Sequence, residues 1–289
     1  MSASASLSSI REPAVAGAFY PASARTLQRD VDELLDKAAP AKPAGRVFGV
    51  VSPHAGYVYS GFTAAHAYRA LKGMTFDAVI VVGPSHQEYF RGISVYSGRG
   101  YRTPLGTVPV NDSLRSAIVQ EEKRIVCSDA GHRGEHSVEV QLPFLQRVLG
   151  EFSFVPVVMG DQTADLCENL AEALAGAVSG NNVLLVASSD LSHYHPYAEA
   201  TLLDNRVVDL VELFEPAALM EKLKHRELEA CGGGPIVAVM LAARKLGAMS
   251  ARVVHHCNSG DITGEKDAVV GYLAAILSNN PPDHPRKVN

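Results

Sequence analysis

Three histidines each follow closely on a short run of apolar residues. His54 follows VFGVVS in the string SPHAGY, His86 follows AVIVV in GPSH, and His193 follows NVLLVA in SSDLSH. Neutral imidazole is the commonest side-chain ligand for divalent transition metals. If the apolar runs are parallel strands, their carboxyl ends meet at one edge of a sheet, and the three imidazoles gather there. The sequence therefore predicts a metal-binding or catalytic site at this edge.

A centre with two histidine ligands still needs an anionic ligand, and Asp190, Glu135 and Cys231 all qualify by residue type. Spacing does not choose among them. An additional observation favours Cys231 as the ligand: it precedes GGGP and the apolar run IVAVMLAARKL. A cysteine at the start of a helix lies near the positive end of the helix dipole, which favours thiolate. Metal ligation and nucleophilic catalysis both require a thiolate, so both remain open.

The neighbouring polar residues also have simpler interpretations. Asp190 could cap a helix, as aspartate often does. His136 follows Glu135 at the start of the helical pattern HSVEVQLPFLQRVL and could be structural. The sequence alone thus leaves the roles of Asp190, Glu135 and His136 undecided.

Two kinds of segment alternate between the ends of the chain. The apolar runs VFGVVS, DAVIVVGPS, FSFVPVVMG, NVLLVASSD and ARVVHHCNSGD are typical of strands buried on both faces of a mostly parallel sheet. Amphipathic helical patterns lie between them, while residues 93–110 suggest a local antiparallel excursion. We expect an α/β fold with one domain over residues 11–279, a disordered lead-in over 1–10 and a disordered tail over 280–289.

Composition narrows the class of protein. The 289 residues are 47% hydrophobic and 20% charged, with a formal net charge of -5, and no basic cluster suggests a nucleic-acid partner. No apolar run approaches the roughly 18 residues of a membrane span, and the start lacks the pattern of a secretory signal. The four cysteines are scattered without a C-x-x-C pair. We expect a cytoplasmic protein without disulfides, and a homodimer is an option for an α/β domain of this size.

At these motifs the sequence resembles the MEMO family. The strings REPAVAGAFYPA, PHAGYVYSG, GPSH, EHSVEVQLPFLQ, SSDLSHY and a Cys-Gly step before a helix occur in the family's order, from about Arg11 to Leu277. The chain looks like the bacterial and archaeal members associated with AMMECR1-like and radical-SAM proteins. The resemblance implies those proteins as partners. It also implies the fold of class III extradiol dioxygenases, a three-layer α/β/α sandwich.

Members of this family carry a metal site of two histidines and one cysteine. The resemblance places these ligands at His54, His86 and Cys231. Because thiolate is softer than the carboxylate of the true dioxygenases, we expect iron(II), with copper or zinc as alternatives.

The resemblance also assigns residues around the metal. Asp190 and His193 match the family's pocket pair, so His193 is expected to act as acid or base. Glu135 and His136 match residues that border the pocket.

These expectations lead to three hypotheses about function. The first is a metal-dependent, dioxygenase-like oxidoreductase acting on a small molecule, with an aromatic substrate as one option and Tyr20, Tyr57 and Tyr194 lining its pocket. The second is a metal-containing scaffold that recognises a peptide or partner protein through the same cleft. The third is a hydrolase in which Cys231 is the nucleophile. The sequence leaves open whether the protein turns over any substrate.

Overall fold

The structure is a computed structural model that describes residues 9–40 and 42–281. The lead-in expected at 1–10 and the tail expected at 280–289 lie mostly outside these residues. At the two boundaries, Ile10 belongs to strand β1, and the carbonyl of Asn280 accepts a hydrogen bond from Ser250 Oγ.

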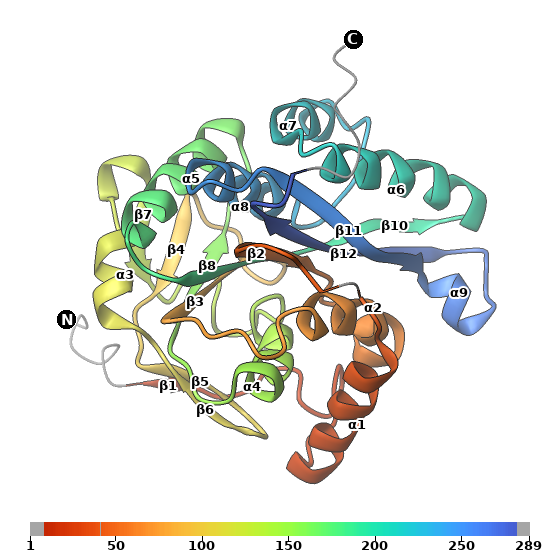
Figure 1. The fold of residues 1–289 in the computed structure, drawn as a ribbon, viewed down its shortest axis with the longest axis horizontal. Coiled ribbons are helices and arrows are strands. Elements are labelled where there is room, and N and C mark those ends of the chain that lie inside the picture. The colour runs from red at the N-terminus through yellow and green to blue at the C-terminus, as the bar shows by residue number, and fades with distance from the viewer. Residues whose placement is uncertain (1–8, 41, 282–289) are drawn as a thin grey trace.

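A nine-stranded sheet forms the centre of the molecule (Figure 1). Eight strands follow the order β10-β12-β2-β9-β3-β8-β4-β7, and β11 pairs with β12. Their bounds are β2 (Val47–Ser52), β3 (Ala78–Pro84), β4 (Ile93–Tyr96), β7 (Ile125–Ser128), β8 (Phe154–Met159), β9 (Val183–Ser188), β10 (Asp190–His195), β11 (Ser250–Asn258) and β12 (Val269–Ser278). The four central strands β2, β9, β3 and β8 run parallel, whereas β4 and β12 pair antiparallel with their central neighbours.

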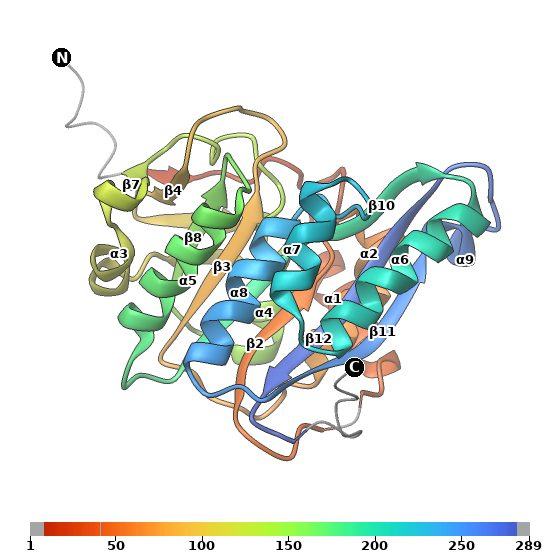
Figure 2. The ribbon, with the colours of Figure 1, turned by 90° about the horizontal axis from the view of Figure 1, so that it is seen from above.

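Helices cover both faces of this sheet, so the expected three-layer α/β/α architecture is confirmed (Figures 1 and 2). One layer contains α1 (Ala24–Lys37), α2 (Tyr57–Arg69) and α4 (Leu142–Leu149). The other contains α3 (Asp112–Ile118), α5 (Ala164–Val178), α6 (Tyr197–Glu212), α7 (Pro216–Lys224) and α8 (Gly233–Lys245). None of the helices within the described ranges is long and apolar enough to cross a membrane.

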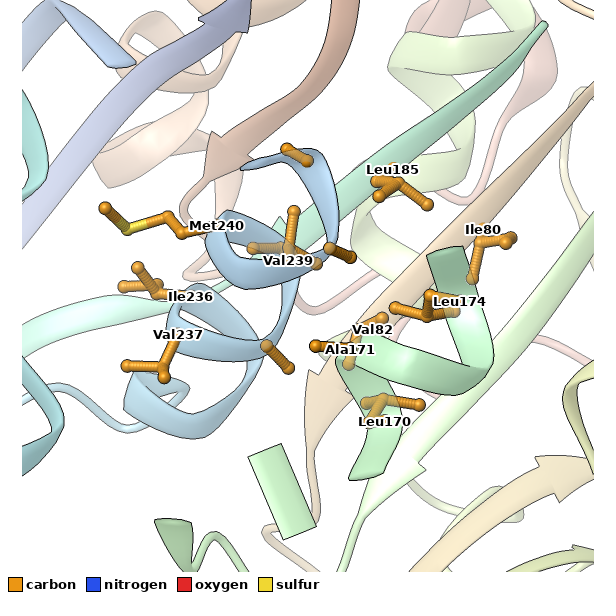
Figure 3. Close-up of a cluster of buried hydrophobic side chains, with 14 of the residues drawn as sticks. Ile80, Val82, Leu170, Ala171, Leu174, Leu185, Ile236, Val237, Val239 and Met240 are labelled. Carbon is orange, nitrogen blue, oxygen red and sulfur yellow. The ribbon is translucent and has the colours of Figure 1, made fainter. Parts of the chain in front are cut away.

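Strand alternation explains the two cores. Along β3, Val79 and Val81 belong to the core under α1, α2 and α4, whereas Ile80 and Val82 belong to the core under α5 and α8. Every residue of β2, β3, β8 and β9 is buried, as their continuous apolar runs predicted. Figure 3 shows part of the second core, with Ile80, Val82 and Leu185 of the sheet beside Leu170 and Leu174 of α5 and Val239 of α8.

The remaining elements are short. Strands β1 (Ile10–Arg11), β5 (Gly100–Thr103) and β6 (Gly106–Pro109) form a small separate sheet, in which β5 and β6 make the antiparallel excursion expected within residues 93–110. The helical pattern after His136 begins as the 3-10 turn η3 (Glu139–Gln141), and η2 (Glu121–Lys123) and α9 (Ser259–Thr263) complete the set.

Candidate metal centre

Three potential ligand side chains converge at the carboxyl edge of the parallel strands. His54 lies in the loop after β2, His86 lies in the loop after β3, and Cys231 immediately precedes Gly232, the N-cap of α8. One ligand atom of each side chain lies within 4.8 Å of the other two. The Sγ atom of Cys231 is 3.2 Å from Nε2 of His54. This is the set that the family resemblance implied.

The hydrogen bonds of Ser188 fix the tautomer of His54. The Ser188 hydroxyl donates its single hydrogen to the carbonyl of Ser137 at 2.6 Å and accepts one from Gln141 Nε2 at 2.8 Å. The third contact of this hydroxyl is with Nδ1 of His54, at 2.8 Å. Because the hydroxyl hydrogen is already used, Nδ1–H of His54 must be the donor in this contact. Burial is the main cause that lowers the pKa of His54, and the neighbouring His86 lowers it further, so this imidazole is neutral. The Nε2 lone pair is left facing Cys231.

Glu135 orients His86 in a similar way. One carboxylate oxygen of Glu135 lies 2.9 Å from Nδ1 of His86 and also accepts the backbone N–H groups of His136 and Ser137. Burial alone would raise the pKa of Glu135, but the hydrogen bonds that its carboxylate accepts from His86 and Ser137 outweigh burial and lower the pKa overall. The ionised carboxylate makes Nδ1–H of His86 a donor and leaves Nε2 free. Metal-bound histidines commonly have such a carboxylate behind them.

Two glycines and a glutamine explain the position of Cys231. A Cβ atom on Gly232 would collide with the carbonyl oxygen of Ser188, and one on Gly234 would lie 2.8 Å from Cβ of Gln162. The Gln162 side chain donates to the carbonyl of Cys231 at 2.8 Å and accepts the N–H of Gly234 at 2.7 Å. The glycine run therefore lets the start of α8 pack closely enough to bring Cys231 to His54.

The helix start does not make Cys231 a thiolate by itself. Burial raises the pKa of the Cys231 thiol, and the nearby Asp190 raises it further. The N–H of Asp190, 3.2 Å from Sγ, opposes these effects only in part. The first amides of α8 are also occupied, because Gly232 N–H donates to Ser189 Oγ. The expected effect of the helix dipole is thus outweighed, and a nearby cation is needed to hold the thiolate.

Asp190 and His193 lie beside these three residues. Asp190 accepts the backbone N–H of His54 at 2.8 Å and starts strand β10, so it does not cap a helix. Burial raises the pKa of Asp190 to about 7. Nδ1 of His193 contacts the carbonyl of Leu191 at 2.9 Å, which makes Nδ1–H the donor and leaves Nε2 unprotonated, and burial lowers the pKa of His193. One ligand atom each of Asp190, His193 and Cys231 also lies within 4.8 Å of the other two.

A cavity of about 600 Å³ opens onto this centre. His54, His86, His136, Asp190 and His193 contribute to its wall. The rings of His86 and His136 stack with their centroids 4.7 Å apart. Glu135 lies behind His86 and is not among the lining residues.

Four aromatic residues also line this cavity: Phe19, Tyr59, Tyr194 and Tyr272. Of these, sequence reasoning named only Tyr194. Its backbone has φ 63°, at an irregularity in the pairing of β10 with β12. Regular alternation would send successive side chains to opposite faces, but here His193 and Tyr194 both line the cavity. Tyr194 is 76% exposed, so its ring lies toward the solvent.

Tyr20 and Tyr57 are not among the residues that line this cavity. Both are buried; the hydroxyl of Tyr57 donates to the carbonyl of Val140 at 2.7 Å, and that of Tyr20 donates to Glu139. The sequence neighbours Phe19 and Tyr59 line the cavity in their place. Residues two apart on a helix point in different directions, so Tyr57 of α2 enters the core while Tyr59 does not.

Comparison with known proteins agrees with this architecture. Residues 11–276 match the family model described as Memo-like protein. A MEMO1 family protein of Sulfolobus acidocaldarius is 39% identical over 282 residues, covering 92% of this chain and 98% of the relative. One of Thermotoga maritima is 37% identical over 278 residues, covering 92% and 99%. The crystal structure of an uncharacterized Escherichia coli K12 protein matches with a TM-score of 0.55 at 17% identity, covering 81% of this chain and 100% of that chain, which shows similarity of fold alone. The chain therefore belongs to the Memo-like protein family.

Proposed function

We propose that this protein is a metal-dependent, dioxygenase-like oxidoreductase that holds one iron(II) ion through His54, His86 and Cys231. The observation that carries the proposal is the convergence of these side chains with both histidines held in the ligand tautomer. Ser188 and Glu135 each occupy one ring nitrogen, so Nε2 of each histidine is available without rearrangement. Such orientation by neighbouring groups is typical of metal-binding histidines.

The donor set fits a borderline or soft divalent ion. Two imidazoles and one thiolate suit iron(II), copper or zinc better than magnesium or calcium, which prefer oxygen ligands. Only three protein ligands are required, which leaves positions for a substrate. When bound, iron would supply Lewis acidity and redox chemistry at these positions.

The residues around the centre provide for proton transfer. His193 is neutral because burial lowers its pKa, and its unprotonated Nε2 can accept a proton from a substrate hydroxyl. Asp190, with a pKa of about 7, holds the backbone of His54 in place. His193 is therefore the proposed base, and Asp190 positions a ligand beside it.

The cavity wall supports a small aromatic substrate. Phe19, Tyr59 and Tyr194 offer apolar ring surfaces, while the histidines lie at the polar part of the same cavity. Aromatic rings pack favourably on one another in tilted or offset arrangements. A phenolic or catecholic ring could thus contact the tyrosines while its hydroxyl reaches His193.

A second function has one specific observation in its favour. The 3.2 Å contact between Cys231 Sγ and His54 Nε2 is also the arrangement of a cysteine nucleophile and its base. Against it, burial raises the pKa of the thiol and lowers that of the imidazole, which disfavours the charged pair. We therefore favour the oxidoreductase over the hydrolase as the function of this protein.

Oxygen consumption tests the proposal. Iron-loaded protein is expected to take up oxygen with at least one phenolic, catecholic or indolic compound, and His193→Gln is expected to slow this uptake by about 100-fold. No uptake with any compound of these classes contradicts the oxidoreductase. Turnover of thioesters or amides by the metal-free protein, abolished in Cys231→Ser, would support the hydrolase instead.

A further inference from the structure

A second cavity, of about 620 Å³, reaches the candidate metal centre separately from the first. It is formed by β10, α7, the loop between α7 and α8, and the start of α8. Among the described residues, His193 alone lines both cavities, and Cys231 lines the second but not the first. A molecule in this cavity can therefore approach Cys231 without passing the aromatic wall of the first.

The walls of the second cavity combine apolar and cationic groups. Leu191, Met220, Leu223 and Leu228 supply apolar surface. Such surface suits the hydrocarbon part of a small molecule.

Lys224 and Arg226 supply positive charge. The carboxylate of Glu229 also lines this cavity and lies 3.0 Å from Nε2 of His195. Lys224 lies 3.7 Å from Glu221, and the Arg226 guanidinium has no hydrogen bond or ion pair with any residue of the described ranges. Of the charged residues that line the cavity, two are cationic and one is acidic, so their net charge is positive.

The loop that carries Arg226 has a fixed and unusual backbone. Arg226 has φ 56°, a conformation that non-glycine residues seldom adopt. Its N–H donates to the carbonyl of Leu223 at 3.0 Å, and the next N–H, of Glu227, donates to Lys222 at 2.9 Å. These two hydrogen bonds form the Schellman motif that ends α7, in which the residue after the C-cap is left-handed. The end of the helix therefore fixes the backbone from which Arg226 lines the cavity.

We infer that the second cavity binds a small aliphatic carboxylate. The carboxylate pairs with Arg226 and Lys224, and the hydrocarbon part packs against Leu223, Met220 and Leu228. This binding goes beyond the proposed function and needs no metal. Its consequence, that the centre meets two different molecules through two cavities, rests on the proposed function.

Hexanoate is the probe for this inference, and metal-free, full-length protein is the sample. Of the six methionines in the chain, Met220 lines the second cavity. With ¹³C-methyl methionine labelling, hexanoate is expected to shift the Met220 NMR signal, assigned with Met220→Leu, and to leave Met74 on the other side of the sheet unchanged. Titration of this shift gives the Kd.

The double variant Lys224→Gln/Arg226→Gln is expected to weaken hexanoate binding at least about fivefold, because charged hydrogen bonds to the carboxylate are lost. Lys72→Gln, an exposed lysine after α2, is the matched control and should leave Kd unchanged. An unshifted Met220, or equal affinity in the double variant, overturns the inference. Equal shifts with hexanol overturn the role of charge, and equal shifts with inorganic phosphate overturn the role of the hydrocarbon part. Since no metal is present, these outcomes are independent of whether the proposed iron site exists.

Discussion

The Glu135 carboxylate accepts a hydrogen bond from Nδ1 of His86 at 2.9 Å, and this contact determines which nitrogen His86 can offer to a metal. The carboxylate is itself held by the N–H groups of His136 and Ser137. A glutamine at this position is isosteric but uncharged, and it weakens the preference for this tautomer. We expect Glu135→Gln to lower metal affinity by about 10- to 100-fold. Competition titration with a chelator measures the change. Exposed Glu151→Gln is the control, and equal affinities of the two variants would contradict the role of Glu135.

Gln162 holds the turn that carries Cys231. Its amide bonds both the Cys231 carbonyl and the Gly234 N–H, so Gln162→Ala frees the turn without removing a ligand. We expect metal affinity to fall about tenfold, because groups that orient metal ligands typically contribute this much. When cobalt(II) occupies the site, we also expect a weaker thiolate-to-metal charge-transfer band. Gln28→Ala, on the exposed side of α1, provides the control. An unchanged band and affinity in Gln162→Ala would show that Cys231 is positioned without this clamp.

Gly232 and Gly176 provide a paired test of close packing. A Cβ atom on Gly232 meets the backbone of Ser188, whereas one on Gly176 in α5 meets nothing within 4 Å. We expect Gly232→Ala to lower the free energy of unfolding by about 2 kcal/mol through overpacking. Gly176→Ala should raise it by about 0.5 to 1 kcal/mol through helix propensity. Urea denaturation measures both, and a neutral Gly232→Ala would mean that the chain does not need this close approach.

His132 makes stability depend on pH. It is fully buried; Tyr101 donates to its Nδ1 at 2.6 Å, and its Nε2–H donates to the Ser94 carbonyl at 3.2 Å. Burial lowers its pKa from 6.5 to about 3, so below pH 6.5 the unfolded chain binds a proton that the folded chain excludes. Its stabilising contribution is complete above pH 6.5 and falls as the pH decreases toward 3, by about 2 kcal/mol at pH 5.

The corresponding measurement is the slope of unfolding free energy against pH between 6.5 and 4.5. We expect this slope to be smaller in His132→Asn than in the wild type, whatever the absolute stability of the variant. Gln28→Ala, at an exposed position without a titratable group, should retain the wild-type slope. The same slope in His132→Asn as in the wild type would show that other groups account for the acid sensitivity.

The sequence was sufficient to predict the central strands and the edge where the site lies. The apolar runs ending near His54, His86 and Asp190 are strands β2, β3 and β9, and their parallel order brings these ends together. The long antiparallel strand β12 is harder to predict. Its continuous apolar run fits a buried helix as well as a strand, so the sequence does not indicate that Tyr272 lines the cavity.

The details of the site depend on packing that no local pattern encodes. Cys231 reaches His54 only because α8 packs against the end of β9, a contact between segments far apart in the chain. Similarly, the resemblance pointed to Glu135 as a pocket residue, but its hydrogen bonds place it behind His86. Tyr57 and Tyr59 are almost adjacent in sequence, and only the orientation of α2 decides which one lines the cavity.

The most direct test of the metal centre is the metal content of protein purified without oxygen, measured by elemental analysis beside Cys231→Ser. We predict about one iron per chain in the wild type, because two oriented imidazoles and one thiolate form a complete set of ligands. The Cys231→Ser variant should lose this iron while remaining folded by circular dichroism. A wild-type protein that contains no metal and takes up none on anaerobic titration would contradict the proposed centre.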